Sequence, residues 1–412
     1  MNGVKILISP LSWGFGHAGR MIPLALELRR RGCEVFFASD TLLLQMAEKE
    51  LPGITVLEIP GFRIRYSRLL PQYICIFLQL PVIIMSAVRD HLLLRQLAKQ
   101  ISPSVIISDN RFGFFHREIF SVYVTHQIRI PLPGPLGIME PIAALMHRLI
   151  IRRYDLCLVP DYPGDINLSG RLSHSLITDP GSRSWLSGKL VYMGPLSRFA
   201  MPGTNPAETP VQPHSTDENP SQPSPSEFDF PQPPPDAGDF PPPAAPYACL
   251  VLSGPEPQRT LLLEKVMKGL SSTPLIVLTA SPANKVPREG NSAQYIVSPG
   301  TATMRRVIAG ASLVITRAGY TSIMELASLN MSAVLIPTPG QPEQEYLGKY
   351  LHGRYGFMTM KQNRLKPLAT LAENMTGQSA GAGNDTGFRL QLPDPAKLFE
   401  NAIKLLSEQE KK

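Results

Sequence analysis

One stretch, residues 312–345, constrains the fold of this chain more than any other part of its sequence. It opens with SLVIT, a short apolar, β-branched run that is typical of a buried parallel strand. Gly319 then permits a tight turn and a close approach of the backbone to a ligand. Thr321 or Ser322 is expected to cap the helix that follows, and a second buried strand, AVLIP, comes after that helix. This order of elements predicts a doubly wound parallel α/β sheet.

The same stretch carries the groups that a nucleotide sugar needs. The N-terminus of the predicted helix offers free N–H groups and the positive end of the helix dipole to an anion, and Arg317 adds charge that can stabilise a departing diphosphate. Glu325, one turn into the helix, suits the two hydroxyls of a ribose. Gln344 and Glu345 end a Pro/Gly-rich loop after the second strand and suit a sugar. We therefore expect a nucleotide-sugar pocket here.

Residues 317–347 (RAGYTSIMELASLNMSAVLIPTPGQPEQEYL) resemble the donor-binding motif of GT-B glycosyltransferases. The resemblance is nearest to the MurG-type N-acetylglucosaminyltransferases of peptidoglycan synthesis and their family-28 relatives. It implies that the diphosphate is held by Gly319 and Ser322, the ribose hydroxyls by Glu325, and the sugar by Gln344 and Glu345.

The stretch departs from the peptidoglycan enzymes at two positions. Those enzymes usually show a second Gln and, three residues later, an Asn, where this chain has Glu345 and Gly348. The donor sugar therefore stays open among N-acetylglucosamine, glucose, galactose and others, with UDP as the expected nucleotide. No D-x-D triplet occurs in the sequence, so we expect neither a metal ion on the diphosphate nor a cofactor.

A second glycine-rich segment follows the first predicted strand, VKILIS. Gly14, Gly16 and Gly19 have G-x-G-x-x-G spacing, His17 lies among them, and a helix is expected to begin at Arg20. The spacing alone is weak evidence for a dinucleotide site. The combination resembles the N-terminal glycine loop of the GT-B family, whose histidine approaches the acceptor, and it implies the same for His17. A histidine that only caps or hydrogen-bonds the loop is the alternative.

Polar side chains end two further predicted strands, SVIIS and SVYVT. Asp109 and Asn110 follow the first strand, and His126 follows the second. Ligands in open α/β sheets bind beyond the carboxyl ends of the strands, so we expect these side chains in the same cleft as His17. His17 is the first candidate for the base that removes the acceptor proton and His126 the second, while Asp109 would orient the base or bind acceptor hydroxyls. Supporting or turn-capping roles are the alternative for each.

Two Rossmann-like, doubly wound domains that face a cleft are expected on either side of a proline-rich insertion. In this GT-B arrangement, residues 1–198 bind the acceptor, residues 199–247 are the insertion, and residues 248–412 bind the donor. Ser253 and Gly254 end the first strand of the second domain, where GT-B relatives place a glycine turn against the donor phosphates. A helix near the C-terminus is expected to cross back over the first domain.

The insertion differs sharply in composition from the rest of the chain. Residues 201–246 hold fifteen of the 42 prolines and seven acidic residues, with no Lys or Arg. They have too little apolar surface to offset the entropy of ordering, so we expect disorder with extended segments, acting as a spacer or as a partner-binding segment. Without these residues the formal net charge rises from +7 to +14. Such a charge favours an anionic substrate and an anionic membrane surface, and no nucleic-acid-binding motif accompanies it.

Residues 73–88 (YICIFLQLPVIIMSAV) form an uncharged run between arginine clusters at 63–68 and 148–153. A transmembrane helix needs about 20 apolar residues, and Gln79 and Pro81 interrupt this run, so we expect no span. A buried helix is one interpretation, and a helix that lies in the membrane interface is the other. Because no signal peptide is visible and the cysteines are scattered, we expect a cytoplasmic protein able to attach peripherally to the inner face of the cytoplasmic membrane.

Together these features predict an inverting glycosyltransferase that moves a hexose or an N-acetylhexosamine from a UDP-sugar to an acceptor hydroxyl. The resemblance implies a lipid-linked acceptor, as in enzymes of cell-envelope synthesis. Two alternatives stay open. One is a UDP-sugar 2-epimerase of the same architecture, and the other is a catalytically silent donor-binding subunit that docks a partner through the proline-rich insertion.

Overall fold

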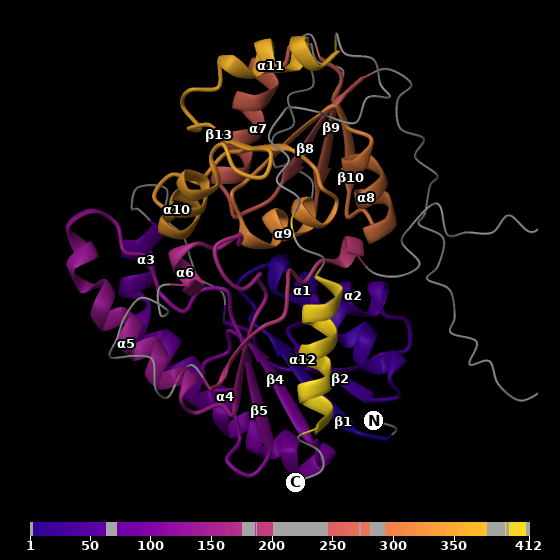
Figure 1. The fold of residues 1–412 in the computed structure, drawn as a ribbon, viewed down its shortest axis with the longest axis vertical. Coiled ribbons are helices and arrows are strands. Elements are labelled where there is room, and N and C mark those ends of the chain that lie inside the picture. The colour runs from indigo at the N-terminus through magenta and orange to yellow at the C-terminus, as the bar shows by residue number, and fades with distance from the viewer. Residues whose placement is uncertain are drawn as a thin grey trace, which may run out of the picture.

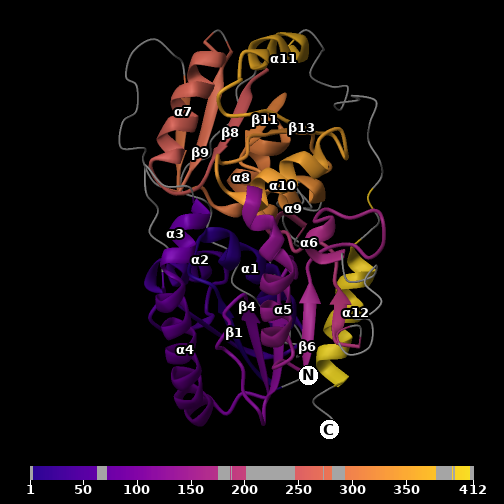
Figure 2. The same ribbon diagram turned by 90° about the vertical axis from the view of Figure 1, so that its left-hand side faces the viewer.

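The computed structural model describes residues 3–62, 72–174, 186, 188–200, 246–271, 273–280, 293–376, 392 and 395–408. These residues form two parallel sheets, each flanked by helices (Figures 1 and 2). The predicted α/β class with two doubly wound domains is therefore confirmed. The proline-rich stretch 201–245 and the arginines at 63–68 lie outside the described residues.

The first domain is built on a sheet of seven described strands in the order β3-β2-β1-β4-β5-β6-β7, and every pair is parallel. Its strands are β1 (Lys5–Pro10), β2 (Glu34–Ser39), β3 (Thr55–Glu58), β4 (Val105–Asp109), β5 (Phe120–Val124), β6 (Leu156–Val159) and β7 (Leu190–Tyr192). The strand order reverses between β1 and β4. A ligand crevice is expected there, beyond the carboxyl ends of these two strands.

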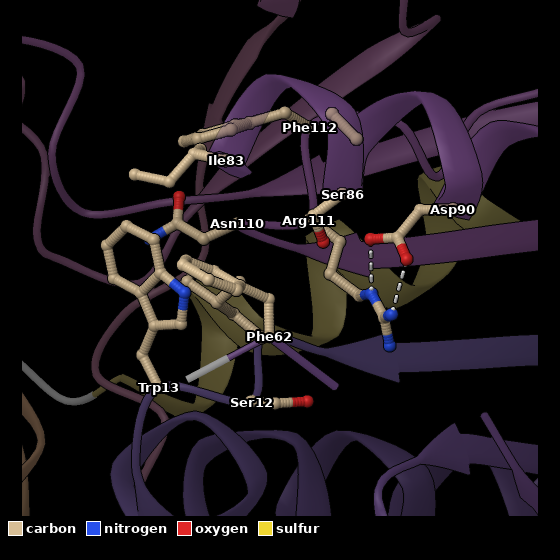
Figure 3. A pocket seen from close by; sticks show the side chains of 11 residues that line it. Ser12, Trp13, Phe62, Ile83, Ser86, Asp90, Asn110, Arg111 and Phe112 are labelled. Carbon is tan, nitrogen blue, oxygen red and sulfur yellow. Dashed lines mark hydrogen bonds and ion pairs between the residues drawn. The ribbon is translucent and has the colours of Figure 1, made fainter. Parts of the chain in front are cut away.

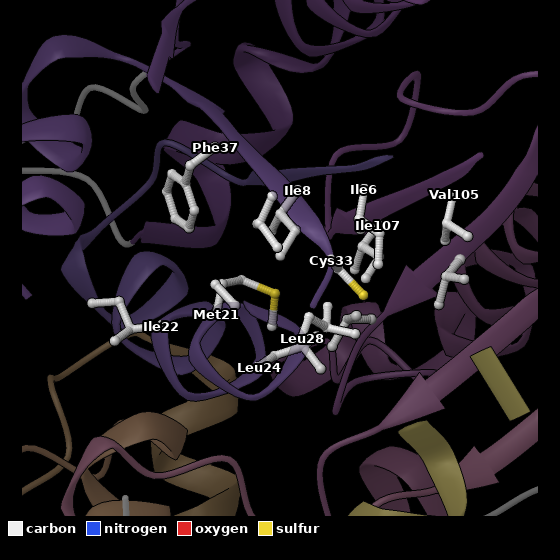
Figure 4. Close-up of a cluster of buried hydrophobic side chains, with 14 of the residues drawn as sticks. Ile6, Ile8, Met21, Ile22, Leu24, Leu28, Cys33, Phe37, Val105 and Ile107 are labelled. Carbon is white, nitrogen blue, oxygen red and sulfur yellow. The ribbon is translucent and has the colours of Figure 1, made fainter. Parts of the chain in front are cut away.

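Helices cover both faces of the first sheet. They are α1 (Phe15–Arg30), α2 (Thr41–Glu50), α3 (Gln72–Leu78), α4 (Leu80–Ile101), α5 (Glu140–Ile151) and α6 (Arg171–His174), with short 3-10 turns η1 (Gly134–Met139) and η2 (Arg198–Ala200). Figure 4 shows Ile6 and Ile8 of β1 beside Met21 and Leu24 of α1, within the largest apolar cluster of this domain. Alternating burial along β1 is absent because both faces of a parallel sheet are covered.

The second domain repeats the same winding with six described strands in the order β10-β9-β8-β11-β12-β13. Its strands are β8 (Ala248–Leu252), β9 (Leu275–Thr279), β10 (Ala293–Val297), β11 (Leu313–Thr316), β12 (Ala333–Leu335) and β13 (Phe357–Thr359), and its helices are α7 (Gln258–Gly269), α8 (Thr301–Ala309), α9 (Tyr320–Ser328), α10 (Pro342–Leu351) and α11 (Pro367–Thr376). The order reverses between β8 and β11. The Gly319 turn that follows β11 therefore lies at the switch point of this sheet.

The last helix, α12 (Ala396–Glu408), returns to the first domain, as expected from the sequence (Figure 1). Ala402, Ile403 and Leu406 are fully buried in the cluster that contains the β1 side chains. A Cβ on Gly194, just after β7, would lie 2.8 Å from Pro395, so the two crossing segments touch. This packing ties the C-terminal end of the described chain to the first domain.

Two local predictions were wrong. The helix expected from Arg20 begins at Phe15, and Gln344 and Glu345 lie in the first turn of α10 rather than in a loop. The four cysteines are buried, and none of them forms a disulfide.

Candidate functional site

The site lies where the two switch points meet. Helix α1 of the first domain begins after Gly14, and helix α9 of the second begins after Gly319, and no side chain caps either helix. The Thr321 hydroxyl donates to the Gly16 carbonyl at 3.2 Å, and a Cβ on Gly16 would lie 2.7 Å from that hydroxyl oxygen. Two helix N-termini, each with free backbone N–H groups, therefore converge across the domain boundary.

The predicted glycine loop is only partly a loop. Gly14 precedes α1, while Gly16, His17 and Gly19 lie within its first two turns. Helix propensity disfavours glycine, but both helical glycines allow close packing, Gly16 against Thr321 and Gly19 against the side chains of Met46 and Arg198. Placing His17 on a helix fixes its direction more firmly than a loop would.

A carboxylate orients His17. Asp109, at the end of β4, is fully buried and lies 2.9 Å from His17 Nδ1. Arg20, one turn along α1, donates from Nε to both Asp109 oxygens at 3.0 Å, and its Nη2 makes a further short contact with Oδ1. His17 Nδ1 also lies 2.9 Å from Arg20 Nη2, which can only donate, so the bond to Asp109 requires the tautomer with a proton on Nδ1. In that tautomer His17 Nε2 keeps its lone pair, and it has no hydrogen-bond partner among the described residues. The pair is arranged as a base and its orienting acid.

The charges around His17 favour its neutral form. Burial and the charge of Arg20 both lower the pKa of His17. Asp109 raises it by less, so the pKa of His17 stays below its usual value. Burial alone would raise the pKa of Asp109, but Arg20 and His17 outweigh it and hold that pKa below its usual value. At neutral pH, Asp109 is therefore charged and His17 is an unprotonated base.

His126 is placed differently from His17. Its Nδ1 lies 3.0 Å from Arg20 Nη1, and its Nε2 lies 2.9 Å from Glu343 Oε1 at the start of α10. Its ring stacks on Tyr320 with a centroid distance of 4.1 Å and an interplanar angle of 2°. Because both ring nitrogens have partners, the geometry favours His17 over His126 as the base. His126 instead joins the two domains.

Sequence reasoning missed Arg20 and Glu343. Burial alone would raise the pKa of Glu343, but His126, Arg20 and His17 together lower it, so this carboxylate is charged. A chain of contacts thus runs from Glu343 through His126 and Arg20 to Asp109. Pro342 at the start of α10 was an available signal, because proline favours the first helical position and places Glu343 in the first turn.

Glu325 lies on α9 but is engaged within the protein. Its Oε1 accepts from Arg198 Nε at 2.7 Å, and both side chains are buried. Burial lowers the pKa of Arg198, but Glu325 outweighs this effect and raises it. Arg198 belongs to η2, the last described segment before residue 201. The predicted ribose-binding carboxylate therefore pairs with the segment that leaves the first domain, a contact that sequence reasoning missed.

Arg317, which is expected to stabilise the departing diphosphate, is engaged in hydrogen bonds within the second domain. Its Nη1 donates to Gln362 Oε1 at 2.6 Å and to the Ile336 carbonyl at 3.3 Å, and its Nη2 donates to the Gln258 carbonyl at 2.6 Å. The side chain is 1% exposed, and burial lowers its pKa to about 10, so it stays charged at neutral pH. Its hydrogen bonds instead tie α7 to the end of β12.

Gln344 and Glu345 also bond within their own segment. Gln344 Oε1 accepts from the Thr338 amide at 2.9 Å, and Glu345 Oε1 accepts from the Gly340 amide at 2.8 Å. Both side chains thus brace residues 338–341, the loop between β12 and α10. To contact a sugar, Gln344 would have to give up its bond to the Thr338 amide, and Glu345 its bond to the Gly340 amide.

The remaining predicted residues lie at strand ends. Ser253 and Gly254 follow β8, with Gly254 at φ +100° and open space where a Cβ would stand. Ser322 lies in the first turn of α9 beside the converging helix ends, and it does not cap the helix. Asn110 follows Asp109 at φ +55°, a left-handed conformation that Asn tolerates well. Among the described residues, no cluster of three His, Cys, Asp or Glu side chains could hold a metal ion.

Part of the second domain resembles a known glycosyltransferase family. Residues 266–378 match the family model of the glycosyltransferase family 28 C-terminal domain. Over 54 residues the chain is 41% identical to UDP-N-acetylglucosamine--N-acetylmuramyl-(pentapeptide) pyrophosphoryl-undecaprenol N-acetylglucosamine transferase 1 of Bacillus cereus. That match spans 13% of this chain and 15% of the relative's length.

Solved structures resemble the whole chain. The glycotransferase of kitacinnamycin covers 99% of both chains at 16% identity with a TM-score of 0.60, and CalG4, the calicheamicin glycosyltransferase, does so at 13% identity with 0.57. Spinosyn rhamnosyltransferase SpnG, complexed with thymidine diphosphate, covers 97% of this chain and 96% of its own at 15% identity with a TM-score of 0.52. Such identities show the fold. The chain therefore has the GT-B glycosyltransferase fold and is family-28-like through its C-terminal domain.

Proposed function

We propose that this chain transfers a hexose or an N-acetylhexosamine from a UDP-sugar to an acceptor hydroxyl, with inversion at the anomeric carbon. One observation carries the proposal: the oriented base His17 lies on α1, whose first turn touches the first turn of α9 through Gly16 and Thr321. The proposed base, on α1, and the N-terminus of α9, which is suited to bind an anion, thus lie on opposite sides of the boundary between the two domains. Transfer from a nucleotide sugar needs both.

The proposed reaction is a direct displacement. His17 Nε2 takes the proton of the acceptor hydroxyl while that oxygen forms a bond to the anomeric carbon. The bond from this carbon to the diphosphate breaks, and the UDP leaving group keeps the electron pair. Asp109 holds the protonated imidazole that results, because its carboxylate accepts from Nδ1.

The developing charge on UDP is the second requirement. We propose that the free N–H groups at the start of α9, near Gly319 and Ser322, stabilise the diphosphate without a metal ion. Glu325 would accept from the ribose hydroxyls, and Gln344 and Glu345 would contact the sugar. Ser253 and Gly254 would border the phosphates from the end of β8.

A binding screen tests the donor half of this proposal. UDP, dTDP and their sugar conjugates are added to the purified full chain, and the melting temperature is followed with and without EDTA. We expect the largest rise with a UDP-sugar, unchanged by EDTA, because a ligand at 100 times its Kd stabilises the folded state by about 2.7 kcal/mol. No rise with any nucleotide sugar would contradict the proposal.

The pH dependence of transfer should reflect the lowered pKa of His17. The neutral base is lost as pH falls through this pKa, so the acid limb of the kcat profile should have its midpoint below 6.5. Arg20 lowers this pKa, so Arg20→Met should move the midpoint to higher pH. Arg31→Met, which breaks only a partly exposed pair with Glu27, should leave it in place. An acid limb above pH 7 in the parent would contradict the assignment.

We further propose that the acceptor is lipid-linked and is met at an anionic membrane surface. Large apolar side chains are exposed on α3, α4 and the η1–α5 segment, which share one side of the first domain (Figures 1 and 2). The most exposed are Phe77 at 69%, Met85 at 70% and Ile138 at 85%. Cys75 and Ile83 of the same run are buried, so the run packs by one face and exposes the other. No helix in the described part of the chain is long and apolar enough to cross a bilayer.

Basic groups accompany this apolar surface. Arg89 and Arg95 are exposed on α4, and Arg152 and Arg153 follow α5. Each Lys or Arg near an anionic surface contributes about 1 kcal/mol of attraction, and apolar side chains add burial. Apolar and basic groups together fit a lipid surface better than a protein partner, because a bilayer interface offers both acyl chains and anionic head groups.

Liposome co-sedimentation tests the surface. Ile84→Ser combined with Met85→Ser should lower binding to anionic liposomes by about tenfold or more, because burying one such side chain contributes about 1.5–3 kcal/mol. Leu261→Ser and Met358→Ser replace exposed apolar side chains of the second domain and are the controls. Binding should also weaken at high salt. If all of the parent protein stayed in the supernatant with anionic liposomes, the membrane proposal would be contradicted. The acceptor would then have to be a soluble molecule.

A further inference from the structure

Arg20 lies at the centre of the contacts around the proposed base. It is 2% exposed, its Nε donates to both oxygens of Asp109 at 3.0 Å, and its Nη1 lies 3.0 Å from His126 Nδ1. A guanidinium is planar and rigid, so partners on Nε and Nη1 together fix the direction in which Arg20 meets Asp109. The orientation of Asp109, and with it that of His17, therefore depends in part on His126.

The position of the proton on His126 follows from its two partners. Arg20 can only donate, so His126 Nδ1 must accept and carries a lone pair. The ring proton then lies on Nε2, which donates to Glu343 Oε1 at 2.9 Å. His126 is 5% exposed, so water does not readily replace either partner. Hydrogen bonds thus run in one direction, from Arg20 to the ring and from the ring to Glu343.

The second domain holds the His126 ring through two of its helices. Glu343 lies in the first turn of α10, and Tyr320, the first residue of α9, stacks on the ring at a centroid distance of 4.1 Å. Tyr320 is fixed in turn, because its hydroxyl donates to the Pro160 carbonyl at 2.8 Å. His126 can keep both contacts only while the two domains pack against each other.

Another buried arginine–carboxylate pair of the first domain has no such connection. Figure 3 shows Arg111 beside Asp90, with distances of 3.0 Å from Nε to Oδ2 and 2.7 Å from Nη2 to Oδ1. Arg111 also donates to Ser9 Oγ and to the Pro60 carbonyl, so all of these partners belong to the first domain. A buried arginine near the end of β4 can therefore be satisfied without the second domain, and the route from Arg20 to Glu343 is a specific feature.

We infer that Glu343 is a positioning residue for the base His17. Acting through His126, it holds Arg20 in the direction that keeps the Asp109 carboxylate against the base. The base is therefore complete only while the proposed donor domain packs against the first domain. The inference rests on the proposed transfer for the function of His17, but the contacts themselves need no donor.

The charges around His17 give this inference a readout. The charged or titratable groups that face His17 include Arg20 on the same helix, Asp109 from β4, His126 after β5 and Glu343 on α10. His17 is among the groups that lower the pKa of Glu343, and a charge interaction acts on both partners, so Glu343 favours the protonated form of His17. Removing its charge should therefore lower the pKa of His17. Opening of the domain boundary would have the opposite effect, because hydration relieves the burial that lowers this pKa most.

Titration of the full chain without any substrate measures this readout. Histidine labelled with an NMR isotope in its ring gives one signal for each of the eight histidines, and the signal absent from His17→Gln identifies His17. Glu343→Gln should move the midpoint of His17 to lower pH, because glutamine keeps an oxygen for His126 Nε2–H but removes the charge.

The matched control for this titration lies on the same helix. Tyr350→Phe removes only the hydroxyl contacts of Tyr350 with Asn167, which cross the same domain boundary, and it should leave the midpoint of His17 in place. An unchanged or higher midpoint in Glu343→Gln would overturn the inference.

Transfer kinetics separate positioning from a structural role. Glu343→Met should lower kcat by about tenfold, the factor that corresponds to one lost hydrogen bond of ordinary strength. Glu343→Gln should regain most of this loss, because the acceptor oxygen returns, and Tyr350→Phe should keep the parent's kcat.

A double-variant cycle tests whether Glu343 acts through His126. His126→Phe keeps a ring to stack on Tyr320 but loses both nitrogens, so Glu343→Met should lower kcat no further in that background. Equal losses from Glu343→Met with and without the His126 nitrogens would overturn the inference. Absence of transfer by the parent, with the His17 titration as expected, would instead count against the proposed function alone.

Discussion

Replacing His17 by alanine should lower kcat by about 10²–10⁴-fold, the usual contribution of a general base. The physical reason is geometric. His17 Nε2 is the ring nitrogen left without a partner, while Nδ1 is held by Asp109 at 2.9 Å. UDP affinity should stay close to that of the parent, because His17 belongs to the first domain and the proposed UDP contacts belong to the second. Steady-state transfer and UDP titration of the same preparation measure both quantities.

His126→Ala supplies the comparison for this experiment. Both nitrogens of His126 are used, by Arg20 and by Glu343, so its loss should weaken the contact between the domains rather than remove the base. We expect a smaller fall in kcat than for His17→Ala. If His17→Ala kept full activity while His126→Ala lost it, the base would have to be reassigned.

Replacing Glu325 by glutamine should weaken UDP binding at least tenfold. A carboxylate that accepts from two ribose hydroxyls contributes about 1.5–3 kcal/mol through charged hydrogen bonds. Glu325 Oε1 already accepts from Arg198 Nε at 2.7 Å, so the ribose hydroxyls would share this carboxylate with Arg198. Glutamine keeps the shape of the side chain, so the fold should survive the loss of the charge. Isothermal titration with UDP, together with a melting curve of each variant, tests this expectation.

The control for Glu325 is another helical carboxylate of the same domain. Glu264 lies part-way along α7 and is partly exposed, and Glu264→Gln should leave UDP affinity unchanged. Uridine, which keeps the ribose but lacks the phosphates, should lose affinity in Glu325→Gln by a similar factor. Unchanged UDP affinity in Glu325→Gln would reduce Glu325 to a partner of Arg198.

The fold was largely predictable because its signals are local. Buried parallel strands show as short apolar runs, such as SLVIT before Gly319 and VKILIS near the N-terminus. The start of α1 was missed because glycine opposes helix formation locally. There the tertiary contact of Gly16 with Thr321 outweighs propensity, and no local pattern reports a partner 305 residues away.

The sequence predicted which strand ends carry the polar side chains of the site. It did not predict which of these side chains bond to each other. His17 and Asp109 were both expected in the cleft, and the structure joins them. The pair of Glu325 with Arg198 spans 127 residues, so the sequence offers no spacing that would reveal it. The spacing of His17 and Arg20 could have indicated a shared helix face, but only once the helix was known to begin before His17.

The central claim is that one polypeptide holds both the base and the nucleotide-sugar site. Mass spectrometry of UDP released by the purified full chain from UDP-N-acetylglucosamine, UDP-glucose and UDP-galactose tests it most directly, with liposome-borne and soluble acceptors. The account predicts acceptor-dependent release of UDP and a glycosylated acceptor with at least one donor, both reduced by about 10²–10⁴-fold in His17→Ala. Conversion of the free UDP-sugar to its C2 epimer, or no release of UDP with any donor and acceptor, would contradict it.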